Sequence, residues 1–264
     1  MEILSPQNTR VKEWAGLQEK KHRDKSGKYI VEGIHLVQEA LLASAEVEIL
    51  AFDVDKGMPA ELKPLLQSVQ AMEVIGVSAA VIGKVSSTNT PQPVFAVIRK
   101  ERQGVETILA QQGSLVVVLD GVQDPGNVGT IIRSADAAGA DGVILGHGCA
   151  DLYNPKTIRS TMGSLFHLPV AEADLAEVLP QARERGTLLV STSLAGTDSC
   201  YTHDFGGSQW LLIGSEGQGI SPQTAALVDK SIIIPMAGRA ESLNAAMAAT
   251  VLLFEAMRQR GFSS

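Results

Sequence analysis

The chain has 264 residues, of which 45% are hydrophobic and 19% charged, with a formal net charge of -7 at pH 7. This length and apolar content are enough for one large domain or two smaller ones, and we expect two. The net negative charge argues against a protein that coats nucleic acid by bulk electrostatic attraction.

Membrane, secretory and metal-dependent classes are also disfavoured. The sequence contains no run of about 18 uncharged apolar residues, and its start, Met1-Glu-Ile-Leu-Ser-Pro, does not resemble a signal peptide, so we expect a cytoplasmic protein. Cys149 and Cys200 have no metal-ligand spacing and are expected to be free thiols without an assigned role. The scattered histidines form no zinc motif, so we expect chemistry without a metal.

The first hundred residues alternate between helical and strand-like patterns. Such alternation predicts a small α/β/α sandwich over residues 1–99. The expected helices are 8–25, 33–43, 60–68 and 79–85, and the expected strands are 47–52, 71–75 and 94–98.

Two parts of this domain could contact a ligand. Residues 10–28 hold seven basic side chains against three acidic ones, a cluster that could meet phosphates, although a solvated helix face is the more usual meaning of such a run. Residues 86–93, Ser-Ser-Thr-Asn-Thr-Pro-Gln-Pro, form a polar segment rich in helix and strand breakers, which predicts a surface loop able to carry recognition.

The second half restarts the alternation with a stronger apolar signal. Residues 100–113 are charged and polar and are expected to link the two domains. The pattern over 114–264 predicts a mostly parallel sheet with helices on both faces. Its expected strands are 114–120, 142–145, 188–191, 210–213 and 231–234, and its expected helices are 127–139, 155–162, 173–185, 225–228 and 242–261.

Polar residues and glycines follow three of these strands, at the edge where open α/β sheets bind ligands. The first such segment, 119–139, passes from a strand through a glycine-rich turn into a helix, where free backbone N–H groups can hold an anion. It matches neither the dinucleotide fingerprint nor the P-loop. Asn127 is expected to cap this helix rather than to act in chemistry. Arg133 lies on an otherwise apolar helix and is expected to need a carboxylate, phosphate or carbonyl partner.

The other two segments lie near the end of the chain. Residues 211–222 place Glu216 among Gly214, Gly217 and Gly219, and glycines at this density let a backbone fold tightly around a ligand. Residues 231–260 predict a buried strand stopped by a proline, then a loop and a helix that Ser242 caps. That helix is apolar nearly all round, which is typical of a core or a subunit interface.

Together these motifs resemble the SpoU, or TrmH, branch of the SPOUT superfamily, whose members are S-adenosylmethionine-dependent RNA 2'-O-ribose methyltransferases. The resemblance spans the whole chain. Its three motifs are Asp124-Pro-Gly-Asn-Val-Gly-Thr-Ile-Ile-Arg133, Ile213-Gly-Ser-Glu-Gly-Gln-Gly219, and Ile234-Pro-Met with Ser242-Leu-Asn244. The first domain, with Tyr29-Ile-Val-Glu-Gly-Ile-His-Leu-Val-Gln-Glu-Ala40 and Thr90-Pro-Gln-Pro93, is similar to the substrate-binding domain of ribosomal-RNA-modifying members, which shares its fold with RNA-binding ribosomal proteins.

The resemblance implies an architecture and an assembly. It implies a substrate-binding domain over 1–99, a linker over 100–113 and a catalytic domain over 114–264 that ends in a deep trefoil knot, an exception to the near absence of knots. It also implies a homodimer packed through the terminal helix, with each active site built from both subunits.

The resemblance also implies roles for individual residues. The cofactor would be contacted by Gly214, Ile234 and Leu243, with Thr192, Met236 and Ser242 as further candidates from the same neighbourhood. The catalytic pattern falls on Arg133, Asn127, Glu216, Ser242 and Asn244. RNA would be contacted by residues such as Arg10, Lys21, Arg23 and Thr90, together with Arg133.

Two questions stay open at this point. The reaction draws a proton from a ribose hydroxyl, and Arg133 is either the base that takes it or a clamp that stabilises the developing charge, because a guanidinium normally stays protonated. The third motif reads Ser242-Leu-Asn-Ala-Ala246 where many members have Ser-Leu-Asn-Val-Ser, so the start of that helix departs from the family.

We therefore expect a cytoplasmic, homodimeric RNA 2'-O-methyltransferase that acts on ribosomal RNA. Transfer RNA is the alternative substrate. A catalytically silent RNA-binding or ribosome-assembly factor on the same fold is the alternative class. A nucleotide-binding oxidoreductase or kinase is disfavoured, because the sequence lacks the phosphate-binding fingerprint of those enzymes.

Overall fold

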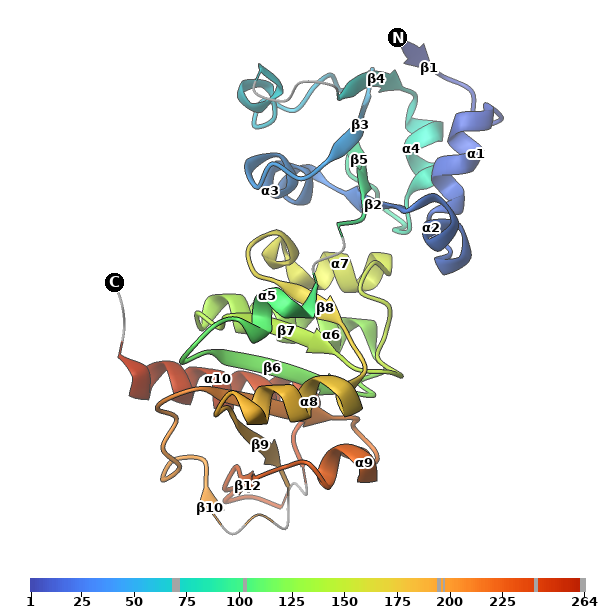
Figure 1. The fold of residues 1–264 in the computed structure, drawn as a ribbon. Helices are drawn as coiled ribbons and strands as arrows, with labels where there is room; N and C mark the ends of the chain where they lie inside the picture. The colour runs from blue at the N-terminus through green and yellow to red at the C-terminus, as the bar shows by residue number, and fades with distance from the viewer. Residues whose placement is uncertain (68–71, 102–103, 194–195, 197, 240–241, 262–264) are drawn as a thin grey trace. The chain divides into compact units, whose positions relative to one another are not determined.

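A computed structural model describes residues 1–67, 72–101, 104–193, 196, 198–239 and 242–261 (Figure 1). The chain forms two compact units. Unit 1 comprises Met1–Glu101 and Asp151–Phe166, and unit 2 comprises Arg102–Ala150 and His167–Ser264.

Unit 1 is built on a five-stranded sheet in the order β1-β4-β3-β5-β2. The first three strands in this order pair in parallel, and β5 pairs antiparallel with both of its neighbours. The strands are β1 (Glu2–Ile3), β2 (Lys28–Glu32), β3 (Val47–Asp53), β4 (Glu73–Val77) and β5 (Val94–Arg99). The helices are α1 (Thr9–Gly16), α2 (Lys20–Ser26), α3 (Ile34–Leu42), η1 (Lys63–Gln67), α4 (Ala79–Val85), α7 (Pro155–Thr161) and η2 (Ser164–Phe166).

Each face of this sheet has its own apolar core. Val11 of α1 and Val81 of α4 are buried against one face. Val37 of α3 and Ile158 of α7 are buried against the other. Unit 1 is therefore a sandwich of helices, sheet and helices, as its sequence predicts.

Unit 2 contains a seven-stranded sheet in the order β10-β12-β9-β11-β6-β7-β8, in which every neighbouring pair is parallel. Its strands are β6 (Leu115–Asp120), β7 (Gly142–Leu145), β8 (Val170–Glu172), β9 (Leu188–Thr192), β10 (Asp198–Ser199), β11 (Gln209–Gly214) and β12 (Lys230–Ile233). Its helices are α5 (Val105–Leu109), α6 (Pro125–Ala137), α8 (Leu175–Glu184), α9 (Pro222–Ala225) and α10 (Ala245–Arg260).

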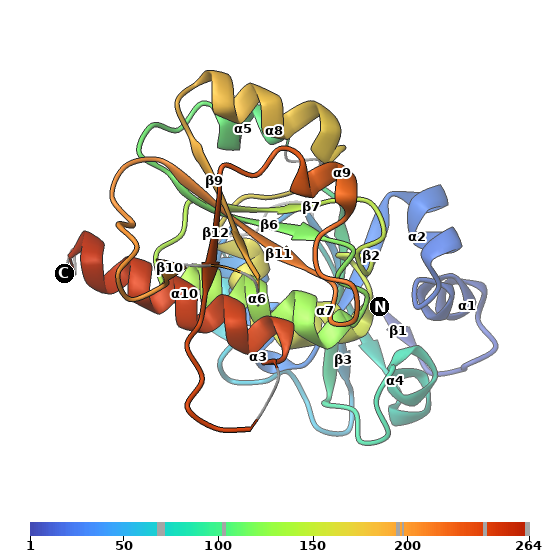
Figure 2. The ribbon, with the colours of Figure 1, turned by 90° about the horizontal axis from the view of Figure 1, so that it is seen from below.

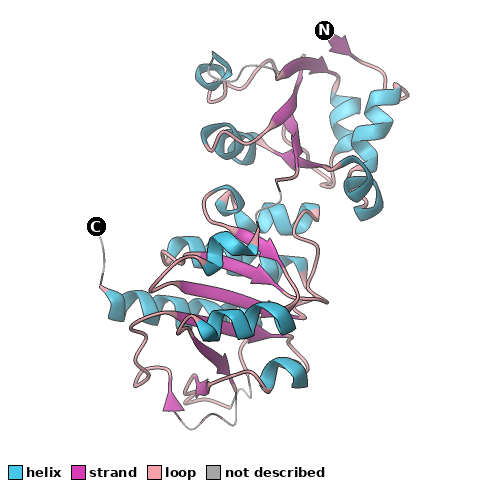
Figure 3. Cartoon of the chain, viewed as in Figure 1, coloured by secondary structure: helices cyan, strands magenta, loops and turns pink. Residues whose placement is uncertain are grey.

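Helices cover both faces of this sheet (Figure 2). The pair α6 and α10 packs together on one face, and α5 and α8 pack on the other, as the colouring by secondary structure also shows (Figure 3). Alternate residues of β6 serve the two sides, since Val116 and Val118 belong to the core beneath α5 and α8. The predicted parallel α/β architecture is confirmed.

The last turn of α10 is bound to the segments that precede β6 and β11. The Arg260 guanidinium donates to the carbonyl oxygens of Phe205 at 3.0 Å, Gly113 at 2.9 Å and Gly207 at 2.6 Å. One turn earlier, hydrogen bonds from Arg258 and Gln259 lower the pKa of Glu255 to about 2. These contacts fix the helix end beyond what its apolar packing supplies.

Several elements differ from their sequence predictions. Residues 8–25 form two helices, because the chain turns after α1 and Arg23 binds the carbonyl oxygens of Leu17 and Gln18 in that turn. The expected helix 60–68 is a short 3-10 turn around Pro64, and residue 68 lies outside the described part of the chain. Strands β1, β2, β8 and β10 were not predicted, since they are short or have charged ends around a small apolar centre.

The compact units also differ from the predicted domains 1–99 and 114–264. Segment 151–166, which follows β7 in the chain, belongs to unit 1, where Ile158 joins the core beneath α3. The predicted linker 100–113 contains α5, whose Ile108 and Leu109 are buried in the core of unit 2. Tertiary packing rather than local polarity decides both assignments.

Candidate active site

A cavity of about 700 Å³ opens in unit 2 beyond the carboxyl ends of β9, β11 and β12. Its size falls in the range of about 300–1,000 Å³ typical of small-molecule sites. The start of α10 and the loop after β11 complete its wall. The described residues that line it are Ser191, Thr192, Ser193, Ile213, Gly214, Ser215, Glu216, Gly217, Gln218, Gly219, Ile220, Ala225, Ser231, Ile233, Ile234, Met236, Ser242, Leu243, Ala245 and Ala248.

The loop after β11 is a tight turn built for close backbone approach. Ser215 and Gly219 exchange two backbone hydrogen bonds of 2.9 and 3.0 Å. A Cβ atom at Gly214 would lie 2.0 Å from the carbonyl carbon of Gly219, so a side chain at position 214 would collide with backbone. The buried Asp120 accepts a 2.7 Å hydrogen bond from the Ser221 amide and anchors the far end of the loop to β6. The turn carries Glu216 at its tip.

The first motif places Asn127 in the opening turn of α6. The helix is capped by Asp124, whose carboxylate accepts a 2.9 Å hydrogen bond from the Asn127 amide. The expectation that Asn127 itself caps this helix is therefore wrong. Capping by Asp124 leaves the Asn127 side chain available for another contact.

The third motif ends in the cap of α10. Asn244 is that cap, because its Oδ1 atom accepts hydrogen bonds from the amides of Ala246 at 2.9 Å and Met247 at 3.3 Å. The expectation that Ser242 caps the helix is wrong, and Ser242 instead lines the cavity. The strand before this loop is also less buried than expected, since Ile232 is fully buried but Ile233 and Ile234 face the cavity.

These three motifs meet in a chain of side-chain hydrogen bonds. Asn244 donates from Nδ2 to Oδ1 of Asn127 at 3.1 Å, and Asn127 donates from Nδ2 to Oε1 of Glu216. The direction of the chain follows from the helix cap, because Oδ1 of Asn244 must face backbone donors and its Nδ2 must then face an acceptor. This relay of hydrogen bonds, from Asn244 through Asn127, links the positive end of α10 to the carboxylate of Glu216 at the cavity.

All six residues predicted to contact a cofactor line this cavity, namely Thr192, Gly214, Ile234, Met236, Ser242 and Leu243. Four further hydroxyl residues line it that the sequence prediction missed: Ser191, Ser193, Ser215 and Ser231. The signal for Ser191, Ser193 and Ser215 was available, because each lies at or just beyond the carboxyl end of a predicted strand.

Arg133 is placed differently from the other predicted catalytic residues. It is exposed on α6 and is absent from the lining of its own chain's cavity. Within the described residues its guanidinium makes no hydrogen bond or ion pair, so the partner expected from its apolar surroundings is not found. An exposed guanidinium without such a partner is free to bind a group from outside the chain.

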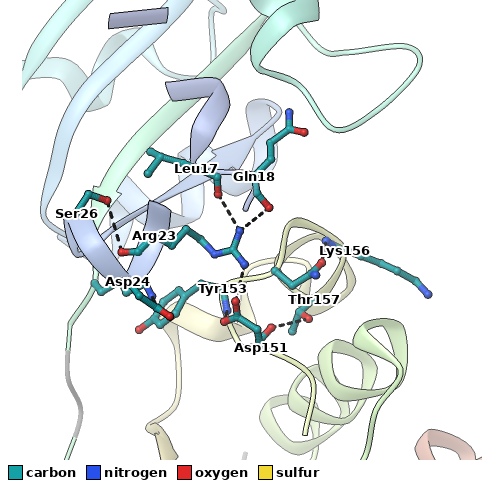
Figure 4. A network of polar contacts seen from close by, with 11 residues as sticks. Leu17, Gln18, Arg23, Asp24, Ser26, Asp151, Tyr153, Lys156 and Thr157 are labelled. Carbon is teal, nitrogen blue, oxygen red and sulfur yellow. Dashed lines mark hydrogen bonds and ion pairs between the residues drawn. The ribbon is translucent and has the colours of Figure 1, made fainter. Parts of the chain in front are cut away.

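Four of the residues predicted to bind RNA lie in unit 1. Lys21 and Thr90 are exposed. Arg10 is engaged by Glu73, whose hydrogen bond raises the pKa of Arg10. Arg23 is buried, with 1% of its surface exposed, and the expectation that it contacts RNA is wrong. Figure 4 shows the reason. The Arg23 guanidinium donates to the carbonyl oxygens of Leu17 at 2.8 Å and Gln18 at 2.7 Å and pairs with Asp151 at 2.5 Å.

Burial raises the pKa of the Cys149 thiol to about 11, which keeps it protonated and unreactive at neutral pH. Among the residues that the structure describes, no group of three or more His, Cys, Asp and Glu side chains is arranged to hold a metal ion. Within the same residues, no helix has the length and apolar character needed to cross a bilayer.

Family profiles match most of the chain. The profile of the SpoU rRNA Methylase family matches residues 114–254, and that of the MRM3-like substrate binding domain matches residues 8–96. Together they cover both units apart from the segment between them and the two ends of the chain.

Curated relatives and solved structures agree with these profiles. The chain is 35% identical over 253 residues to the 23S rRNA (guanosine(2553)-2'-O)-methyltransferase RlmP of Bacillus subtilis, covering 96% of this chain and 98% of that protein. It is 34% identical to a 23S rRNA (uridine(2479)-2'-O)-methyltransferase of Streptomyces viridochromogenes, covering 97% and 92%. The crystal structure of the SpoU methyltransferase AviRb from that organism, in complex with AdoMet, superposes with a TM-score of 0.89 at 35% identity, covering 96% of this chain and 98% of that one.

Proposed function

The chain belongs to the SpoU rRNA methylase family, and from that premise we propose that it transfers a methyl group from S-adenosylmethionine to a ribose 2'-hydroxyl of 23S-type ribosomal RNA. The observation that carries this proposal is the chain of hydrogen bonds that joins Asn244 and Asn127, far apart in the sequence, to Glu216 in the cavity wall. Two relatives that this chain covers over 98% and 92% of their length are named as 23S rRNA 2'-O-methyltransferases, and the similar structure of AviRb contains AdoMet.

The cavity suits S-adenosylmethionine by its lining. Apolar side chains such as Ile233, Ile234 and Leu243 can pack against a flat base, while the folded backbone of 214–219 offers polar groups at close range. Glu216 is the only acidic residue among the described residues of the lining. When bound, the cofactor supplies an electrophilic methyl group on a positively charged sulfur.

The residues around the cavity would hold the ribose hydroxyl, and the carboxylate of Glu216 would take its proton. The relay from Asn244 through Asn127 fixes the carboxylate of Glu216 as a hydrogen-bond acceptor. Ser242 lies on the cavity wall next to this relay and can orient the ribose. Of the two roles left open for Arg133, we propose the clamp, because a guanidinium is a weak base by its general chemistry and can stabilise phosphate or a developing alkoxide.

We place Arg133 in the active site of a partner copy, in a homodimer formed through α10. That helix exposes an apolar stripe of Met247, Val251 and Phe254 at positions i, i+4 and i+7, with Met247 53% and Phe254 42% exposed. Arg133 lies on α6, which packs on α10, and does not line its own cavity. A symmetric dimer through this stripe would bring each Arg133 to a second copy.

Subunit mixing tests this arrangement. One variant carries Arg133→Ala and the other Gly214→Ala, which blocks the cavity, and mixed dimers are isolated with two different tags. If Arg133 acts across the interface, one of the two sites in each mixed dimer is intact, and methyl transfer should return to about half of the wild-type rate. The matched control pairs Asn244→Ala with Gly214→Ala. Each change damages the cavity of the subunit that carries it, so both sites of the mixed dimer are lost and no recovery is expected. Equal, negligible rates in both mixtures would refute the shared site.

The remaining features of the proposal concern fold and place. We propose that unit 2 ends in a deep trefoil knot, supported by the near contact of Gly196 with the backbone of Ile232, where an added Cβ would lie 2.8 Å away. Unit 1 would bind the RNA through exposed residues such as Lys21 and Thr90. A cytoplasmic location follows from the proposed ribosomal substrate.

Calorimetry and ribose-methylation mapping test the function as a whole. S-adenosylmethionine should bind the purified protein, whereas NAD and ATP should not. Mapping of 2'-O-methyl groups across ribosomal and transfer RNA, with and without the gene, should reveal one missing mark in 23S-type RNA. A missing mark in transfer RNA would redirect the substrate, and binding of S-adenosylmethionine without any missing mark would support a silent RNA-binding factor.

A further inference from the structure

The polar loop of unit 1, residues 86–93, is held by a network of side-chain hydrogen bonds that is not part of the candidate active site. Glu32, the last residue of β2, accepts hydrogen bonds from the Ser86 hydroxyl at 2.5 Å, the Ser87 amide at 3.0 Å and the Ser87 hydroxyl at 2.8 Å. One carboxylate thus binds two consecutive residues of the loop through three donors.

Arg159 of α7 holds the same serine from the other side. Its Nη1 atom donates to Oγ of Ser87, whose own proton is given to Glu32. A hydroxyl can donate one hydrogen bond and accept others, so Ser87 links a cation to a carboxylate without conflict. We name Glu32, Ser87 and Arg159 the loop clamp.

The helix that supplies Arg159 is itself fixed within unit 1. Asp151, four residues before α7, forms the buried ion pair with Arg23 (Figure 4). Thr157, Ile158 and Thr161 of the helix are at most 1% exposed. Arg159 is therefore presented from a rigid support, which lowers the entropy lost when it binds Ser87.

The other end of the loop is pinned as well. Oε1 of Gln92 accepts a 2.8 Å hydrogen bond from the amide of Ile34 at the start of α3. A Cβ atom at Gly33 would lie 2.8 Å from that oxygen, and φ of Gly33 is +97°, so glycine is required there. Between the two fixed ends, Asn89 and Thr90 are exposed.

We propose that the loop clamp preorganises the tip Asn89–Thr90 for hydrogen bonding to unpaired RNA bases, and that Glu32, Ser87 and Arg159 are positioning residues for substrate recognition. Short polar side chains on a fixed loop suit the edges of splayed bases, and a loop ordered before binding does not lose that entropy on association. The proposal rests on the proposed RNA methyltransferase function. It makes α7, which the SpoU methylase profile includes, a working part of the substrate-binding unit.

The test uses the full-length protein with unmodified 23S rRNA transcribed in vitro. Ser87→Ala and Arg159→Ala should each raise KM for the RNA about tenfold. Binding would then have to order roughly one more loop residue and would cost the conformational entropy of that residue. The kcat at saturating RNA and the affinity for S-adenosylmethionine should stay at wild-type values. Hydrogen exchange at the amides of 87–90 should quicken in the RNA-free variants, and Ser87→Thr should restore both readouts.

Arg99→Ala is the matched control. Arg99 also lies in unit 1 and binds Glu46 and Glu48, so the variant removes one surface cation without touching the loop. Its KM for RNA should change less than about twofold, as expected for one screened surface charge. An equal rise in KM for Arg99→Ala and Ser87→Ala would overturn the proposal.

The double variant separates positioning from direct contact. If Arg159 acts through Ser87, the double variant should have the same KM as either single variant. If the KM increases of the two single variants multiply in the double variant, Arg159 is instead a direct RNA contact, and its positioning role is overturned. Failure of the wild-type enzyme to methylate the RNA would refute the proposed function, whereas wild-type turnover with unaltered variants would refute this inference alone.

Discussion

Replacing Gly214 with alanine should abolish cofactor binding and methyl transfer. The added Cβ would lie 2.0 Å from the carbonyl carbon of Gly219 and 2.1 Å from the amide nitrogen of Ile220. Both are backbone atoms, so the loop that forms the cavity wall must open and move Glu216 with it. A displacement of about 1 Å at a reacting group can lower a rate about 10²-fold, and we expect at least this loss in kcat together with loss of measurable S-adenosylmethionine binding.

Gly217→Ala is the control for this variant. It changes the same loop in the same way, but a Cβ atom at Gly217 would meet nothing within 4 Å. Gly217 also lines the cavity, but no backbone has to move, so calorimetry with S-adenosylmethionine and a methyl-transfer assay should show a far smaller loss for Gly217→Ala than for Gly214→Ala. Wild-type cofactor affinity in Gly214→Ala, at an unchanged melting temperature, would show that the cofactor binds elsewhere.

Replacing Arg23 with methionine should strongly destabilise unit 1. The change leaves the Asp151 carboxylate, whose side chain is 11% exposed, without its cation and the carbonyl oxygens of Leu17 and Gln18 without their donor. Breaking one partner of a buried ion pair costs about 3–5 kcal/mol of the free energy of unfolding. The loss should be partly recovered by adding Asp151→Leu, which removes the stranded charge.

The two tryptophans allow the effect to be assigned to one unit. Trp14 lies in unit 1 and Trp210 in unit 2, so a Trp210→Phe background leaves Trp14 as the only indole and its fluorescence follows unit 1 during urea unfolding. Arg10→Met is the control, because its partner Glu73 is exposed and such pairs contribute about 1 kcal/mol or less. Equal urea-unfolding midpoints for Arg23→Met and Arg10→Met, together with weaker RNA binding in Arg23→Met alone, would show that Arg23 contacts RNA after all.

Much of the fold follows from local pattern. Helices α3 and α4, strands β6, β7 and β9, and the end of α10 at Arg260 fall within two residues of their predicted bounds, because each has strong periodicity or clear end signals. Short strands such as β8 and β10 lack that signal, since two or three residues carry no period. Their place depends on pairing with β7 and β12.

The sequence predicted which residues form the candidate site but not which hydrogen bonds they make. The strand-end rule and the family motifs identified Glu216 and the six predicted cofactor residues that line one cavity. They misassigned the caps, because Asp124 and Asn127, or Ser242 and Asn244, are equally good capping residues a few positions apart. Which one caps depends on the direction from which the chain enters the helix.

By itself, the sequence determined what local chemistry controls: the parallel α/β architecture, the motif order at the strand ends, and the family. Tertiary structure decided which side chains meet across long separations. It buried Arg23 against Asp151, moved α7 into unit 1 and linked Asn244, Asn127 and Glu216. The physical reason is that periodicity records the faces of an element, whereas the partner of a buried charge or amide is fixed only when distant segments pack together.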